Sequence, residues 1–138
     1  MSAESRPAAQ FVFRVHPERL AIARLPAGSA VPAWAGGSWC TVSSTVDELS
    51  IVCPQSRVPA EVKHERDKIA LGIEGVIPMT TVGLLAALCR ALADAQVPVF
   101  VISTYDTDWL LVSADRFDAA RAALERIGHR LQGSLPAR

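Results

Sequence analysis

Two carboxylates lie close together in one short polar stretch of this sequence. Asp106 and Asp108 flank Thr107 and follow the hydroxyls of Ser103 and Thr104. Aspartates held in a turn can bind an ammonium or guanidinium group through charge-assisted hydrogen bonds, and neighbouring hydroxyls can add further ones. The alternative is that Asp and Thr bond their own backbone, as they commonly do in turns. The spacing of these residues leaves both interpretations open.

A second segment has the complementary chemistry for an anion. Residues 75–81 read Gly-Val-Ile-Pro-Met-Thr-Thr and lead into a leucine-rich stretch that is predicted to be helical. Free backbone N–H groups and the helix dipole both favour a carboxylate at a helix N-terminus. We therefore predict a site for a small molecule between the two segments. Its candidate ligand-binding residues are Gly75, Val76, Ile77, Met79, Thr80, Ser103, Thr104, Asp106, Thr107 and Asp108.

Other reactive side chains form no pattern typical of catalysis or of a metal site. The three cysteines and three histidines are widely spaced, without a Cys-x-x-Cys or a His-Glu cluster, and no phosphate loop or nucleophile motif is present. We interpret the cysteines as buried thiols. The residues in question are Cys40, Cys53, Cys89, His16, His64 and His129. We expect no cofactor, no metal and no enzymatic activity.

The second half of the chain must position the predicted site. Alternating and β-branched segments predict strands over 68–75, 97–104, 109–112 and 129–131. Between them, apolar residues at helical spacing predict one helix capped by Thr80 or Thr81 and another capped by Ser113 or Asp115. The order β-α-β-β-α-β is that of an α+β, ferredoxin-like unit with an antiparallel sheet and both helices on one face.

The first half repeats parts of the second. Residues 44–47 and the strand after them parallel residues 103–106 and, after one extra residue, the strand from 108; residues 20–23 likewise parallel 69–72. The first copy lacks clear helices and has only a polar connector at 55–67. We therefore predict a degenerate N-terminal half at 10–65 and a complete C-terminal domain at 66–133, packed as one body in a tandem arrangement.

The bulk composition limits the partners. The chain has 138 residues, and its fourteen Lys and Arg balance fourteen Asp and Glu. A neutral chain without a basic run is a poor ligand for nucleic acid or an anionic membrane, and neither a signal peptide nor a membrane span is visible. We expect a cytoplasmic protein. Because small sheets of this kind leave strand edges to be covered, we also expect a homodimer.

The hairpin segment carries a resemblance to a known family. Residues 100–112, preceded by Gly83-Leu84-Leu85, resemble the ACT domain and, more narrowly, the tandem-ACT group that includes small bacterial proteins and the cytosolic arginine sensors called CASTOR. The group's Ile-Ser-Thr-Tyr-x-Thr-Asp-aromatic pattern is matched from Ile102 to Trp109. The likeness is clear over 68–131 and weak over 19–54.

This resemblance implies a function. ACT domains are regulatory modules, not catalytic ones, and they bind amino acids or similar molecules at the junction between paired domains. The resemblance thus implies a small ligand-sensing protein with an amino-acid site at the ACT-ACT junction. The alternative is a protein-interaction module without a ligand, which would use an exposed sheet edge or the region of Trp34 and Trp39. A small enzyme is the remaining possibility.

Overall fold

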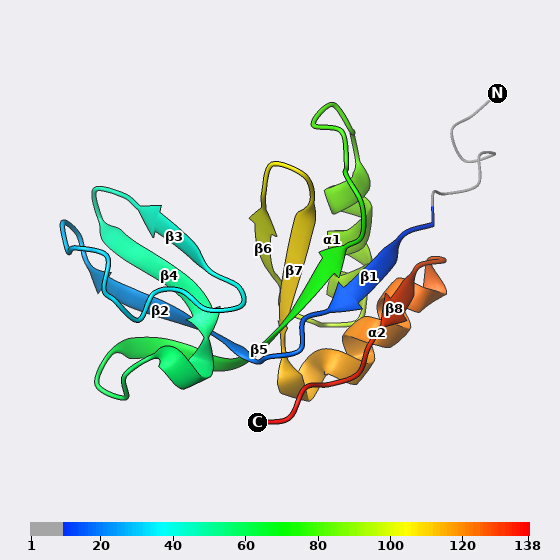
Figure 1. The fold of residues 1–138 in the computed structure, drawn as a ribbon. Coiled ribbons are helices and arrows are strands. Elements are labelled where there is room, and N and C mark those ends of the chain that lie inside the picture. The colour runs from blue at the N-terminus through cyan, green and yellow to red at the C-terminus, as the bar shows by residue number, and fades with distance from the viewer. Residues whose placement is uncertain (1–9) are drawn as a thin grey trace.

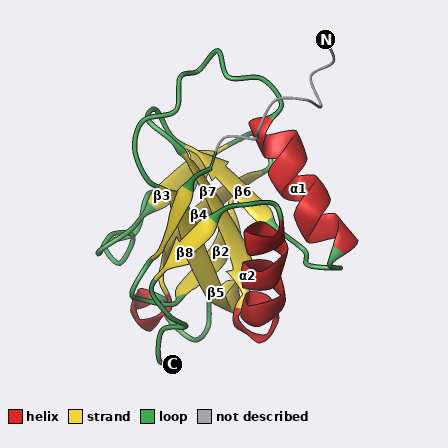
Figure 2. Ribbon diagram, turned by 90° about the vertical axis from the view of Figure 1, so that its right-hand side faces the viewer, coloured by secondary structure: helices red, strands yellow, loops and turns green. Residues whose placement is uncertain are grey.

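An eight-stranded sheet carries two α-helices in the computed structural model, which describes residues 10–138 (Figure 1). Both helices lie on the same side of the sheet (Figure 2). The elements are β1 (Val12–Val15), β2 (Leu20–Pro26), β3 (Thr41–Ser44), β4 (Glu48–Pro54), η2 (Gln55–Arg57), β5 (Lys63–Ile73), α1 (Leu84–Asp94), β6 (Phe100–Ser103), β7 (Asp108–Ser113), η3 (Ala114–Arg116), α2 (Phe117–Arg126) and β8 (Arg130–Gln132).

Strand β5 belongs to both halves of the molecule. Its first part pairs with β2 and its second part with β7, and Lys68 lies opposite Leu20 on one edge and Ser113 on the other. The expected connector over 55–67 is therefore partly wrong, because residues 63–67 already form the beginning of β5. These residues are polar because this end of the strand is largely exposed, so the apolar alternation that signals a strand is missing.

The two halves share one strand order. The first is β3-β4-β2-β5, and the second is β6-β7-β5, continued by β1 and β8. In the second half, β1 lies between β5 and the closing strand β8: Phe13 is opposite Ile73 on β5 and Leu131 on β8. The antiparallel α+β, ferredoxin-like fold is confirmed, with the difference that the N-terminal strand separates the first and last strands of the unit.

The hairpin turns of the two halves correspond more closely in the structure than the sequence indicates. Thr45 N–H donates to the Glu48 carbonyl over 2.9 Å, as Thr104 N–H donates to the Thr107 carbonyl over 2.8 Å. In each hairpin the preceding serine lies opposite the first residue after the turn. The predicted extra residue in the second copy is therefore wrong, since Leu49 corresponds directly to Asp108.

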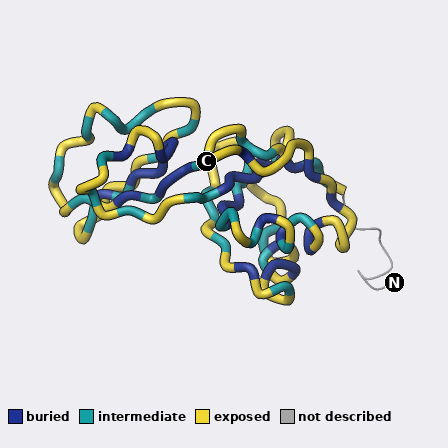
Figure 3. Tube along the Cα trace, turned by 90° about the horizontal axis from the view of Figure 1, so that it is seen from below, coloured by how far each residue is buried: buried dark blue, intermediate teal, exposed yellow. Residues whose placement is uncertain are grey.

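Three groups of buried side chains hold the sheet. The largest joins α1 and α2 to one face of the second half, and the second covers one face of β2 and β4 with the help of Trp34. The third lies between the halves, where Trp39 and Trp109 pack around Leu20, Val52 and neighbouring residues. Figure 3 shows buried segments along the strands of both halves. The halves thus form one body, as predicted.

Both helices begin later than predicted. Gly83 is the N-cap of α1, with a φ of 87° and no side-chain cap, so the caps expected at Thr80 or Thr81 are wrong. A 3-10 turn precedes α2, whose N-cap is Arg116 instead of Ser113 or Asp115. Gly128, shortly after α2, has a left-handed φ of 100°. Neither helix of the described part of the chain is long and apolar enough to cross a membrane.

The cysteine expectation is wrong for two of the three residues. Cys53 is buried in the second apolar group, but Cys40 is exposed and Cys89 is only partly buried. Cys40 lies just before β3, at the end of the loop over residues 27–40, and Cys89 lies on α1 but outside the main apolar group. Their hydrophobic character therefore does not place them in the core.

Candidate ligand pocket

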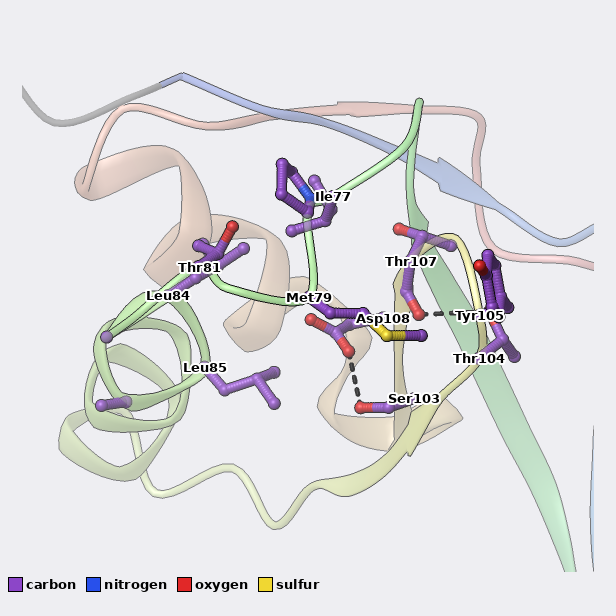
Figure 4. A pocket seen from close by; sticks show the side chains of 13 residues that line it. Ile77, Met79, Thr81, Leu84, Leu85, Ser103, Thr104, Tyr105, Thr107 and Asp108 are labelled. Carbon is purple, nitrogen blue, oxygen red and sulfur yellow. Dashed lines mark hydrogen bonds between the residues drawn. The ribbon is translucent and has the colours of Figure 1, made fainter.

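A cavity of about 390 Å³ lies between the beginning of α1, the loop before it and the turn from β6 to β7 (Figure 4). This size falls within the roughly 300–1,000 Å³ of pockets that hold small molecules. The cavity is lined by Ile77, Pro78, Met79, Thr81, Gly83, Leu84, Leu85, Ala86, Ser103, Thr104, Tyr105, Thr107 and Asp108.

The hairpin supplies the acidic wall. Ser103 and Asp108 lie opposite each other on β6 and β7, and the Ser103 hydroxyl donates to the Asp108 carboxylate over 2.6 Å. The Thr107 hydroxyl donates to the Ile73 carbonyl over 2.8 Å, which fixes the turn to β5. Within residues 10–138 the Asp108 carboxylate has no cationic partner. It therefore presents an uncompensated negative charge to the cavity.

The start of α1 supplies the opposite wall. The first backbone bond of the helix is the one from Ala87 N–H to the Gly83 carbonyl, at 3.0 Å. The N–H groups of Leu84, Leu85 and Ala86 precede it and have no hydrogen-bond partner among the described residues. No side chain caps the helix, and its first turn has no acidic residue. A ligand carboxylate can accept hydrogen bonds from these free donors.

Apolar side chains close the space between the two walls. Figure 4 shows Leu85 on the helix side of the cavity and Met79 on the loop before the helix. Ile77 is partly buried against the main core, whereas Met79 is 73% exposed. The cavity is thus charged on one side, rich in N–H donors on the other and apolar between them.

The loop over the cavity is tied to the hairpin by its backbone. Ile77 N–H donates to the Asp106 carbonyl over 2.6 Å, and Thr81 N–H donates to the Pro78 carbonyl over 3.0 Å. The Asp106 side chain is exposed and does not line the cavity. Asp106 therefore holds the loop through its carbonyl, while the carboxylate is left free in solvent.

The structure brings six of the ten predicted site residues to this cavity. They are Ile77, Met79, Ser103, Thr104, Thr107 and Asp108. Four others lie outside its lining, namely Gly75, Val76, Thr80 and Asp106. The lining also contains residues that were not among the predicted site residues, namely Pro78, Thr81, Tyr105 and the helix start at Gly83–Ala86. The helix start itself is marked in the sequence by Gly83-Leu84-Leu85, although these residues were not predicted to bind ligand.

No group of three or more His, Cys, Asp or Glu side chains within residues 10–138 has the arrangement of a metal site. This holds for the pocket as well, where Asp108 is the single acidic side chain of the lining. The pocket's polar groups are instead suited to an organic ligand that carries charge.

Comparison with known proteins gives the family. The ACT domain family model matches residues 63–126, and a second model, described as an N-terminal domain, matches residues 18–61. A crystal structure of a protein from Agobacterium tumefaciens is 30% identical, with a TM-score of 0.87, and the alignment covers 95% of this chain and 99% of that one. Residues 63–126 thus belong to the ACT domain family. No curated protein matches this chain.

More distant structures share the fold of this ACT protein. One is a Vibrio cholerae protein of unknown function, described as a possible transport protein; it is 17% identical, with a TM-score of 0.68, and 86% of this chain and 90% of that chain are covered. Another is the regulatory subunit of aspartate kinase from Thermus flavus, which is 11% identical with a TM-score of 0.59. The alignment covers 82% of this chain and 94% of that one. At these identities the likeness concerns the fold alone.

Proposed function

We propose that this ACT protein is a cytoplasmic ligand-sensing regulator that binds a free amino acid in the pocket between α1 and the β6–β7 turn. One observation carries the proposal: the unpaired Asp108 carboxylate and the free N–H groups at the start of α1 lie on opposite walls of a single cavity. An α-amino acid has the matching pair of charges within one small molecule.

The proposed binding mode assigns one wall to each charge. The ligand's ammonium donates to Asp108, which keeps lone pairs free beside the Ser103 bond. The ligand's carboxylate accepts from the N–H groups of Leu84, Leu85 and Ala86, where the helix dipole adds to the attraction. Leu85 and Met79 then contact the ligand's side chain, which favours one of modest size and apolar character.

The junction between the two halves is a less suitable place for this ligand. A separate groove of about 400 Å³ lies there, between β3 and β4 on one side and β6 on the other. Its lining contains hydroxyls and apolar side chains but no charged residue. A zwitterion entering that groove would lose its hydration without gaining an ionic partner, so the charged pocket supports amino-acid binding better.

The proposed mode of action depends on the two structural elements that a bound ligand would connect. It would join the helix start to the hairpin, and the exposed side chains of Val76, Met79 and Val82 lie on the loop between them. Ordering this loop changes a surface that another protein can recognise, which is a regulatory output that needs no catalysis. The regulatory aspartate kinase subunit that shares the fold supports this assignment by analogy.

A thermal-shift titration with the twenty common amino acids tests the proposal. A ligand that binds only the native state raises the melting temperature as its concentration rises. Each amino acid that does so is then compared with its decarboxylated amine and its deaminated acid. We expect both analogues to lose most of the shift, because each lacks one of the two charges. An unchanged melting temperature with all twenty would reject the amino-acid assignment.

The alternative function is a protein-interaction module. It is favoured by the edge strands β3 and β6, each of which pairs on one side only within the described residues and exposes an apolar side chain, Val42 at 41% and Phe100 at 42%. A second copy of the chain is the simplest partner for such an edge, in line with the proposed homodimer. Sedimentation as a monomer at high micromolar concentration would exclude that dimer.

A further inference from the structure

Two cysteines face each other across the first hairpin. The register of β3 and β4 pairs Thr41 with Val52 and Val42 with Ile51. Cys40 lies one residue before β3, and continuing this register by one pair places it opposite Cys53 on β4. Directly opposite residues of an antiparallel pair project to the same face of the sheet. Cys53 lies in the apolar group that includes Trp34, and the Cys40 side chain therefore projects to the same face, at its exposed margin.

The hydrogen-bond pattern determines how close the two residues are. Thr45 N–H donates to the Glu48 carbonyl, which makes that pair hydrogen-bonded. Counting outward along the ladder, hydrogen-bonded and non-hydrogen-bonded pairs alternate, and Cys40–Cys53 falls on a non-hydrogen-bonded pair. Such pairs have a Cα separation of about 4.5 Å. That value lies inside the range of about 4.4–6.8 Å in which a disulfide can form without backbone movement.

The surroundings of the two thiols differ, and this difference determines which thiol reacts first. Cys40 is exposed, whereas Cys53 is completely buried. Burial raises the pKa of the Cys53 thiol, and the nearby Cys40 thiol raises it further, while the Gly36 N–H and Arg57 oppose the rise. Burial also raises the pKa of Cys40, again opposed by Arg57. A reagent in solution reaches Cys40, and only Cys40 can reach Cys53.

We propose that Cys40 and Cys53 are a redox-modification site that closes to an intrachain disulfide by exchange with a small disulfide such as oxidised glutathione. The Cys40 thiolate attacks one sulfur of the reagent and releases the first glutathione thiolate. The Cys53 thiolate then attacks Cys40 Sγ in the mixed disulfide and releases the second. The two protein thiols lose two electrons and two protons, and the reagent is reduced to two thiols.

The bond would act on the contact between the two halves. Trp39 is the neighbour of Cys40, and its ring meets Trp109, whose own neighbour is the pocket residue Asp108. Linking Cys40 to β4 fixes the end of the loop 27–40 that carries Trp39. The oxidised protein therefore has a more restrained junction between its halves, beside the hairpin that forms the pocket.

Exposure of the whole protein to oxidised glutathione, followed by thiol alkylation and peptide mass mapping, tests the site. We expect the native chain to lose two of its three thiols, to show a Cys40–Cys53 peptide and to keep no bound glutathione; dithiothreitol should restore all three. Cys89→Ala is the matched control and should behave in the same way, except that it starts from two thiols.

Two further variants test whether Cys40 and Cys53 react in the proposed order. Cys53→Ala should trap glutathione on Cys40, because no second thiol displaces it. Cys40→Ser changes an exposed position and should leave Cys53 as a free thiol. A native chain that retains glutathione on Cys40 beside a free Cys53, or that joins Cys40 of two molecules, would overturn the proposal.

Discussion

Trp39 and Trp109 meet edge to face, with ring centroids 5.4 Å apart and ring planes inclined by 70°. The two residues lie in different halves of the chain, and their contact belongs to the apolar group between the halves. The Trp109 ring also lies directly over Gly72, its cross-strand partner on β5. A Cβ atom at position 72 would lie 2.5 Å from Cζ3 of Trp109. The absence of a side chain at Gly72 is thus what lets this ring reach Trp39.

We predict that Gly72→Ala destabilises the protein. The added methyl group must displace the Trp109 ring, and overpacking of this kind costs about 1–3 kcal/mol. Denaturant unfolding measures the loss, and tryptophan fluorescence should change because the Trp39–Trp109 contact is disturbed. Gly36→Ala is the control, since a Cβ there meets only Arg57 Nη2 at 3.6 Å. Equal stabilities of the two variants would contradict the role assigned to Gly72.

Asp108→Asn should weaken amino-acid binding with little effect on stability. The substitution replaces a charge-assisted hydrogen bond to the ligand's ammonium with a neutral one, a loss of about 1 kcal/mol, or about fivefold in affinity. Asp106→Asn provides the comparison, because its side chain lies outside the pocket and its carbonyl, which holds Ile77, is retained. Isothermal titration on both variants decides: an equal loss in both, or none in Asp108→Asn, would reject the binding mode.

The Asp67 carboxylate should make stability depend on acid pH. A hydrogen bond from Gln55 holds the pKa of Asp67 below its ordinary value, and Arg19, 3.1 Å away, adds to this effect against some burial. A lowered folded pKa means that the stabilisation is complete above about pH 4, the unfolded value, and is lost as the pH falls through the folded value.

The measurement is urea unfolding of the native chain and of Asp67→Asn at neutral and at acid pH. Asn suits the position because Asp67 has a φ of 59°, a conformation that Asn tolerates. The native chain should be the more stable of the two at pH 7, and the difference should shrink below about pH 4. A difference that stays constant through this range would show that the charge of Asp67 contributes nothing.

A fragment of residues 66–138 should not melt cooperatively. It retains α1, α2 and the hairpin but lacks β1, so β8 loses the strand beside it, and the loss of β2, β4 and Trp39 leaves Leu111 and Trp109 uncovered. Circular dichroism with thermal unfolding is sufficient to test this. A monomeric fragment with a sharp transition would show that the C-terminal half is an independent unit.

The parts of the fold that could be predicted from sequence are those with strong local signals. The β6–β7 hairpin has β-branched and aromatic strands around a polar turn, and α1 and α2 have apolar stripes, so their existence and order were predicted correctly. The position of β1 could not be predicted, because pairing with β8 depends on residues more than a hundred positions away. The alignment of residues 20–23 with 69–72 is one residue out of register, because Arg24 lies opposite Ser50 as Gly72 lies opposite Trp109. Small and apolar residues in both strands allow several alignments, and only the cross-strand pairs fix one.

The candidate site also has one wall that could be predicted from the sequence and one that could not. Ser103 and Asp108 could be paired from the hairpin alone, since a four-residue turn places them opposite each other. The other wall could not, because Thr80 and Thr81 are better caps by composition than Gly83, and they suggest an earlier helix start. With the helix starting at Leu84, the free N–H groups move from the 75–81 loop to Leu84, Leu85 and Ala86. That shift moves the predicted anion position along the chain, because the N-cap lies two or three residues later than Thr81 or Thr80.

The location of β1 between β5 and β8 also determines when the protein can finish folding. Val12 and Arg130 are partners, so β1 cannot complete its pairing until β8, more than a hundred residues later, has been synthesised. While the ribosome is still translating, β1 has one free edge and its apolar residues, Phe13 among them, lack the cover of Leu131 and α2. Contacts between such distant residues slow folding and prolong the exposure of unpaired strands. A variant without β8 should therefore keep β1 as an unpaired edge and aggregate more readily than the native chain.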